Sequence, residues 1–99
     1  MRVDVIGKHM EVTEPIRTFA ESKSERLTRH YDGVQRIVFR LEQEPHNKGF
    51  HVEVVVDVEK HDDFVANATG PDLYTCIDQA VDKSVRQLTT FKEKLKQSK

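Results

Sequence analysis

The sequence predicts an α+β domain, a two-layer sandwich in which two helices cover one face of a four-stranded mixed sheet. The chain has 99 residues, which is enough for a single hydrophobic core. Two stretches repeat apolar residues with the period of a helix, and four shorter stretches alternate apolar and polar residues as strands do. Their order is β-α-β-β-β-α. Because each helix is apolar along one side only, both need the apolar face of the sheet.

The first strand and the first helix are expected at residues 1–8 and 13–31. Charged and apolar residues alternate at the start of the strand. Thr13 stands at the capping position of the helix, and a proline follows in the first turn, where proline is tolerated. The apolar positions of this helix are Ile16, Phe19, Ala20, Leu27 and Tyr31. An Asp-Gly pair then ends the helical pattern.

Three more strands and a second helix follow. Residues 34–44 and 50–59 alternate with period two on either side of a turn at 45–49 that contains proline and glycine. A weaker strand at 64–69 ends at a Gly-Pro pair, and the second helix runs over 72–95. The apolar face of that helix consists of Leu73, Ile77, Ala80, Val81, Leu88, Phe91 and Leu95.

The topology follows from the order of these elements. The first helix should join two parallel strands by a right-handed crossover, and the later strands should form antiparallel hairpins. The sheet face turned away from the helices carries Glu42, Glu44, Glu53, Asp57 and Glu59. Because carboxylates cannot be buried without partners, we expect this face to lie in water.

The composition is that of a soluble globular domain. Hydrophobic residues make up 36% of the chain and charged residues 33%. The longest strictly apolar runs are three residues, at 37–39 and 54–56, whereas a membrane span needs about 20 and a signal peptide about 7 to 15. A single cysteine excludes an internal disulfide. These features predict a cytoplasmic protein without a membrane partner.

The net charge of −1 conceals a strong separation of charge along the chain. Residues 32–72 hold four basic and nine acidic residues, whereas residues 83–99 hold six basic residues and one acid. On helical projection, cations line one side of each helix: Lys23, Arg26 and Arg29 on the first, and Lys83, Arg86 and Lys94 on the second. Asp78 and Asp82 are turned away from the row on the second helix.

Such rows have the spacing that an RNA backbone requires. Cations one helical turn apart, about 5.4 Å, present charges at intervals comparable to those of phosphates, and phosphate contacts give affinity that depends on salt and not on sequence. From the pattern alone, a solvated helix surface explains these cations equally well. Tyr31 and Tyr74 could stack on bases, although a position at the edge of the core is favoured for both.

Residues that could support catalysis or bind a metal do not come together in the sequence. It contains no glycine-rich phosphate loop, no Cys-x-x-Cys and no nucleophile elbow. The five histidines are scattered, and the stretch at 61–63 is typical of a solvated turn rather than of a metal site. Cys76 lies beside the apolar face of its helix and is expected to be an inert, small hydrophobic residue. We therefore expect no enzymatic activity, no cofactor and no metal.

The sequence nevertheless resembles a known family over nearly its whole length. The stretches are GKHMEVTEPIR at 7–17, GPDLYTCIDQAVDK at 70–83, RQL at 86–88 and KEKLK at 92–96. They are similar to the bacterial ribosome hibernation promoting factors and ribosome-associated inhibitors. The resemblance implies the β-α-β-β-β-α fold and a non-catalytic protein of idle, stationary-phase cells. Such a protein binds the small ribosomal subunit in the mRNA and tRNA channel and blocks translation.

The resemblance also implies which residues contact ribosomal RNA. The matching positions are Lys23, Arg26, Arg29, Lys83, Arg86, Lys92 and Lys94. Two positions depart from the family pattern: Thr90 stands where relatives often carry a lysine, and Ser24 stands where they usually carry an apolar residue. The expected partners are the small subunit and its RNA, together with another factor for forming ribosome dimers, and no small-molecule substrate is expected.

The expected organisation is one ribosome-binding domain over residues 1–97, followed by a tail at 98–99. The chain would then be a short-form factor or the N-terminal part of a long one. A general double-stranded-RNA-binding or RNA-chaperone domain, using the same helices, is the alternative. A small phosphate-ester or acyl-phosphate hydrolase is disfavoured, because the loops offer no cradle of arginine and asparagine for a phosphate.

Overall fold

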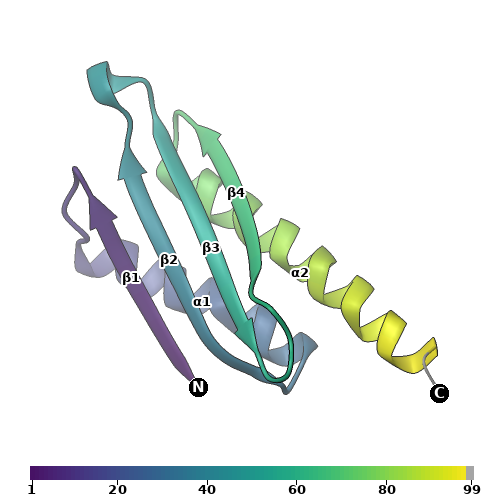
Figure 1. The fold of residues 1–99 in the computed structure, drawn as a ribbon. Helices are drawn as coiled ribbons and strands as arrows, with labels where there is room; N and C mark the ends of the chain where they lie inside the picture. Colours follow the sequence, from purple (N-terminus) through teal and green to yellow (C-terminus); the bar gives the residue numbers. More distant parts are fainter. Residues whose placement is uncertain (98–99) are drawn as a thin grey trace.

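The computed structural model describes residues 1–97, without the side chains of residues 47 and 97, and confirms the predicted α+β fold. The tail expected at 98–99 lies outside this range. Figure 1 shows the element order β1 (Arg2–Lys8), α1 (Glu14–His30), β2 (Val34–Gln43), the 3₁₀ turn η1 (Pro45–Asn47), β3 (Phe50–Val58), β4 (Phe64–Gly70) and α2 (Leu73–Gln97). No helix among the described residues is both long enough and apolar enough to cross a membrane.

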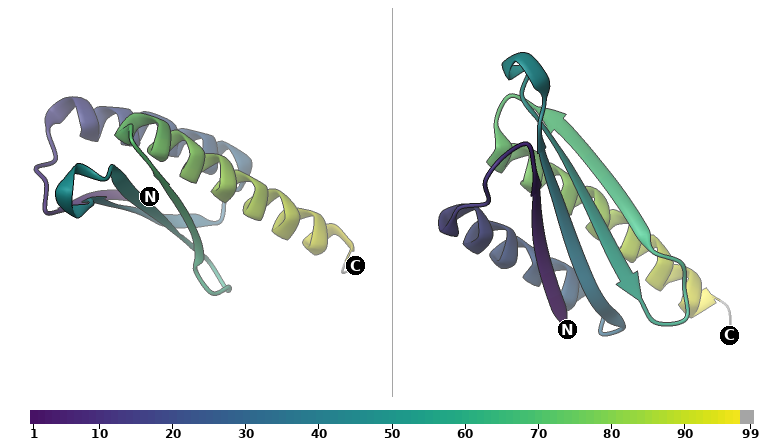
Figure 2. Two further views of the ribbon diagram at one scale, coloured as in Figure 1. Left: turned by 90° about the horizontal axis from the view of Figure 1, so that it is seen from above. Right: turned by 60° about the vertical axis from the view of Figure 1, so that its left-hand side comes forward.

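The four strands form one sheet in the order β1-β2-β3-β4. β1 and β2 are parallel, and the other two pairs are antiparallel, as the sequence predicts. Both helices lie on the same side of the sheet, so that its other face is open (Figure 2). β4 forms one edge of the sheet and lies beside α2, whereas α1 packs against α2 and reaches β1 and β2.

The core fills the space between the sheet and the helices. The register places Phe39 of β2 opposite Val54 of β3, and Val54 opposite Ala66 of β4, so that one row of side chains faces the helices. The largest fully buried side chains include Phe39, Leu27, Ile37, Leu41, Ile77 and Leu88. These residues come from both helices and from β2, which explains why the two layers pack as one unit.

Two serines are buried within the helices, and the hydroxyl group of each donates a hydrogen bond to a backbone carbonyl of the same helix. Ser24 Oγ donates a hydrogen bond to the carbonyl of Glu21 at 2.6 Å, and Ser84 Oγ donates to the carbonyl of Ala80 at 3.0 Å. A buried hydroxyl is costly only when it lacks a partner. This accounts for a polar residue at position 24, where members of the resembled family usually carry an apolar one.

The helix ends differ slightly from the sequence prediction. Thr13 occupies the N-cap position of α1, but its side chain makes no capping hydrogen bond. Tyr31, which was expected within α1, has an extended backbone and follows the last helical residue. At the start of α2, Asp72 Oδ2 accepts hydrogen bonds from the backbone N–H and the hydroxyl of Thr75, at 3.2 and 2.5 Å. These bonds lower the pKa of the Asp72 carboxyl group.

We predict that Asp72→Ala lowers the free energy of unfolding at neutral pH. Because the pKa of Asp72 is lower in the folded protein, its carboxylate stabilises the fold above the ordinary pKa of 3.8. That stabilisation is lost as the pH falls through the lowered pKa. Urea denaturation between pH 7 and pH 3 should show the difference between wild type and variant shrinking in acid. Asp63→Ala, at an exposed turn residue, is the control, and an equal effect from both variants would contradict the capping role.

Candidate nucleic-acid interface

The α2 helix places two side chains against the free edge of β4. Lys83 Nζ donates a hydrogen bond to the carbonyl of Asn67 at 2.6 Å, and Gln87 Nε2 donates to the carbonyl of Val65 at 3.0 Å. Both side chains thus cover the edge of a strand that has no neighbour on this side. Lys83 therefore supports β4 as well as carrying charge at the surface, a role that the sequence did not reveal.

Further along the same side of α2 lies a hollow of about 390 Å³. Its lining residues are His61, Phe64, Arg86, Gln87, Thr90, Phe91 and Lys94. Arg86 is exposed and makes no hydrogen bond or ion pair with any other residue of the described chain. Its guanidinium group is therefore available to an external anion.

Two cations of α1, Lys23 and Arg26, lie in the groove between the two helices, where acids of α2 meet them. Lys23 Nζ lies 3.0 Å from a carboxylate oxygen of Asp78. Arg26 lies 2.6 Å from Asp82 and 3.8 Å from Asp78. The four side chains are 31–44% exposed, so each pair contributes little to stability, about 0 to 1 kcal/mol. The pairs do, however, offset part of the positive charge of α1.

The sequence placed Asp78 and Asp82 away from the basic row of α2, and the structure agrees with this placement. The sequence did not, however, indicate that the side of α2 that carries Asp78 and Asp82 faces α1. Docking the two helices by their apolar faces would have brought these acids opposite the cations of α1, so the signal was present in the helical projections.

At the far end of the same groove, Lys92 of α2 contacts the end of α1. Its Nζ donates a hydrogen bond to the carbonyl of His30 at 3.2 Å, at the helix terminus where a cation is favoured. The ring of His30 lies 2.8 Å from the hydroxyl of Thr89. Arg29 is 3.4 Å from Glu25 on its own helix. The contacts of Lys92 and Thr89 with His30 hold the ends of the two helices together.

The seven predicted contact residues thus form two groups on either side of α2. The edge group, beside β4, consists of Lys83, Arg86 and Lys94. The groove group consists of Lys23 and Arg26, which pair with acids of α2, and of Arg29 and Lys92, which line one hollow at the end of the groove. Three members of the groove group have acidic partners within the protein, and Lys92 has a carbonyl partner. Arg86 of the edge group has none among the side chains that the structure describes.

The two tyrosines occupy the core edge, as favoured from the sequence. Tyr31 meets Phe91 edge to face, with ring centroids 5.4 Å apart. Tyr74 meets Phe19 in the same way at 4.9 Å. Their rings are therefore already engaged with other aromatic rings.

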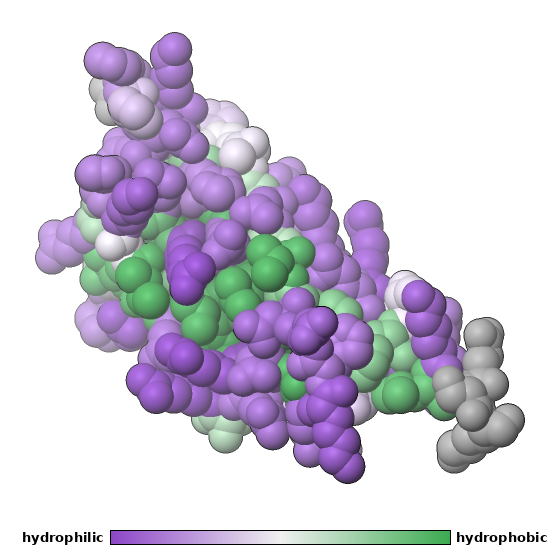
Figure 3. All heavy atoms as spheres, viewed as in Figure 1, coloured by the Kyte–Doolittle hydropathy of each residue, from purple (hydrophilic) through white to green (hydrophobic). Residues whose placement is uncertain are grey.

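The open face of the sheet is less acidic in effect than the sequence suggested. Arg36 lies 2.8 Å from Asp4, and its hydrogen bond lowers the pKa of that carboxyl group. Arg40 lies 3.0 Å from Glu53. Between these pairs an apolar strip crosses the strands, visible in the middle of Figure 3; it contains the cross-strand neighbours Val38, Val55 and Val65. The expected solvated face is thus a mixture of ion pairs and valines, with Val38 only 7% exposed.

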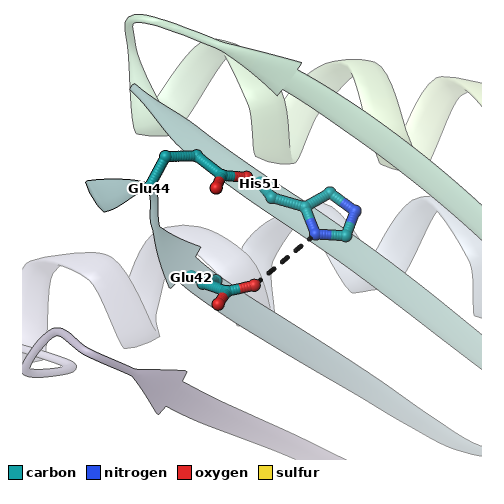
Figure 4. Close-up of side chains that lie close together, drawn as sticks. All are labelled: Glu42, Glu44 and His51. Carbon is teal, nitrogen blue, oxygen red and sulfur yellow. Dashed lines mark ion pairs between the residues drawn. The ribbon is translucent and has the colours of Figure 1, made fainter. Parts of the chain in front are cut away.

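One group of side chains on this face has the composition of a metal site. Ligand atoms of Glu42, Glu44 and His51 lie within 4.8 Å of one another (Figure 4). The group already has partners within the protein, because Lys8 lies 3.8 Å from Glu42 and the His51 ring lies 2.8 Å from Asn67 Oδ1. The sequence did not suggest this group because only the register of β2 and β3 places residue 42 opposite residue 51.

Comparison with known proteins identifies the family. The model of the family described as Sigma 54 modulation protein / S30EA ribosomal protein matches residues 3–96. The chain belongs to this family. The ribosome hibernation promoting factor of Escherichia coli K12 is 32% identical over 99 residues, covering 98% of this chain and 99% of that protein. The factor of the same name from Pseudomonas putida is 34% identical over 94 residues, covering 95% and 89%. The resemblance seen in the sequence is therefore confirmed.

Two solved structures share the fold. The N-terminal domain of Thermus thermophilus Protein Y superposes with a TM-score of 0.82 and 32% identity, covering 92% of this chain and 99% of that one. A ribosomal subunit interface protein from Coxiella burnetii superposes with a TM-score of 0.84 at 20% identity, covering 94% and 99%. At that identity the second similarity supports the fold alone.

We predict that removing the acids of the groove strengthens binding to a polyanion. Asp78→Asn combined with Asp82→Asn frees Lys23 and Arg26, and should tighten binding to heparin about 2- to 30-fold at low salt if each broken pair is worth about 0.2–1 kcal/mol. Glu11→Gln with Glu59→Gln changes the net charge equally at exposed positions without releasing a cation. Equal gains from the two double variants would show that net charge, and not the freed cations, is responsible.

Proposed function

We propose that this protein is a ribosome hibernation factor, acting in the cytoplasm. It binds the small ribosomal subunit in the channel for mRNA and tRNA, and it blocks translation without catalysing a reaction. One observation carries the proposal: the similarity to the Escherichia coli hibernation promoting factor extends over 98% of this chain and 99% of that protein. The functional unit of that relative therefore has its counterpart within this chain.

The edge group and the groove group supply the surface for RNA. All seven cations lie along α2 or on the helix packed against it. Contacts of such cations with phosphates fix the position of a protein on RNA without reading its sequence. Arg86 is the strongest single candidate, because its planar group binds phosphate through two hydrogen bonds and has no competing partner among the described residues.

The mechanism is steric exclusion. The domain measures 51 × 22 × 18 Å, and a closely packed body of this size prevents RNA from entering the same space. Charge repulsion from the open sheet face contributes less than its acids suggest, because Asp4 and Glu53 are paired with arginines. The protein therefore needs only to bind the channel tightly in order to block it.

The described residues also support a non-catalytic role. Cys76 is buried, and burial raises the pKa of its thiol, so the reactive thiolate is disfavoured. The hollow beside Arg40 and Glu53 and the hollow beside His61 are open surface depressions, lined by an ion pair and by aromatic rings respectively.

We predict that Arg86→Glu weakens co-sedimentation with small ribosomal subunits by about ten- to a hundredfold, the cost of losing a charge-assisted hydrogen bond.

Binding of the unmodified protein should also weaken with salt, with a slope of log affinity against log salt near −4 to −5 if about five phosphates are neutralised. Lys83 is left unchanged in the Arg86→Glu variant because its side chain also covers the edge of β4.

The matched control is Lys48→Glu, which makes the same charge change at an exposed loop residue. Equal losses from the two variants, with unchanged circular dichroism, would place the contact surface elsewhere. Binding to RNA duplexes without binding to ribosomes would instead favour a general double-stranded-RNA-binding domain.

We further predict competition between this protein and tRNA. A tRNA in the P site, with mRNA, should displace the protein from small subunits in a titration followed by fluorescence anisotropy, and the protein should inhibit initiation in a cell-free translation reaction. If the protein and the tRNA occupy one subunit together without loss of affinity, steric exclusion is wrong.

A further inference from the structure

An exposed histidine is packed against two phenylalanines beside the edge group. The ring of His61, in the turn between β3 and β4, stacks on Phe64 with centroids 4.7 Å apart and planes 11° apart. It also meets Phe91 of α2 at 4.7 Å with planes inclined by 60°. Phe64 and Phe91 are themselves 5.4 Å apart. His61 is exposed, whereas both phenylalanines are partly buried against the core.

The histidine ring is held in place before any ligand arrives. Its Nδ1 lies 2.6 Å from the carbonyl of Asp62, at the distance of a donated hydrogen bond. Lys60, just before it, has a left-handed backbone with φ of 61° that shapes the turn. Together with the contacts to Phe64 and Phe91, these features fix an aromatic ring at the surface. A ring that is already immobilised loses little entropy when a ligand stacks on it.

The side chains around the His61 ring favour an anionic ligand on the side of α2 and disfavour one on the side of the turn. The hollow of about 390 Å³ that His61 borders is also lined by Arg86 and Lys94. Its size falls within the range of about 300–1,000 Å³ typical of small-molecule sites. Asp62 and Asp63 lie on the turn itself, where they would repel a phosphate. A nucleotide would therefore place its phosphate toward α2 and its base toward His61.

We propose that His61, supported by Phe64 and Phe91, is a stacking platform for one unpaired RNA base, with the adjacent phosphate held by Arg86. The inference rests on the proposed function, since it specifies which part of an RNA meets the edge group. Proteins that bind single strands combine cations along the backbone with aromatic rings for the bases, and this site has both. The bases of a duplex are stacked inside it and cannot reach the ring.

The test is binding of a ten-nucleotide single-stranded RNA that contains 2-aminopurine, whose fluorescence is quenched by stacking. His61→Ala should reduce quenching and weaken binding about 5- to 150-fold, the cost of losing one base-stacking contact. His61→Phe retains an aromatic ring and should restore most of both signals. His51→Ala, on the open sheet face, is the control and should change neither.

A second variant distinguishes loss of the stacking site from disruption of the turn that carries His61. Thr90→Leu fills part of the hollow from α2 while leaving the three aromatic rings in place, and it should also reduce quenching. Circular dichroism then confirms that both variants are folded. Retained quenching in His61→Ala and Thr90→Leu, or an equal loss of binding to single-stranded and duplex RNA, overturns the platform.

The same variants separate this inference from the proposed function. If wild type and His61→Ala bind ribosomes and the oligonucleotide equally well, the platform is wrong while the proposed hibernation role stands. If the wild type binds and quenches the oligonucleotide through His61 but fails to bind ribosomes, the platform is supported and the hibernation role is wrong.

Discussion

The burial of α2 between α1 and β4 is the constraint on which the rest of the structure depends. Leu73, Ile77 and Leu88 are almost completely buried against the sheet, and a helix with its apolar side fixed in this way has no freedom to rotate. The packing of its apolar side therefore decides which neighbour each of the other sides of α2 faces. Asp78 and Asp82 must face α1, where Lys23 and Arg26 meet them. The opposite side must face the edge of β4 and the turn that precedes it.

The distribution of charge is a consequence of this packing. Cations between the helices have acidic or carbonyl partners, which fasten α1 to α2 and reduce their attraction for RNA. Arg86, on the β4 side, has no such partner among the described residues. A protein with a net charge of −1 thus presents a local cationic surface at Arg86, because Asp78 and Asp82 on the same helix are held against α1.

The fold could be predicted from the sequence because it depends on periodicity within each segment. Alternation at 50–59 and helical spacing at 72–95 are local signals, and together with the handedness of crossovers they fix the strand order. The pairs that shape the site are not local. Glu42 meets His51 only through strand register, and His61 meets Phe91 across 30 positions of the chain. The family resemblance supplied seven cations, but only the structure shows that they form two groups with different partners.

The division between the two groups also assigns different tasks to the two sides of α2. Ion pairs between the helices are partly solvated and exchange readily with external anions, so the groove group suits a polyanion that supplies many weak contacts. The edge group lies beside a hollow with fixed aromatic walls, where a contact depends on shape and is less sensitive to salt than a pair of exposed charges. On the open sheet face, Arg36 and Arg40 pair with Asp4 and Glu53 and so offset part of its negative charge. In the proposed function, this difference between the faces orients the domain on RNA with the helices inward and the sheet outward, and its packed volume then excludes other strands.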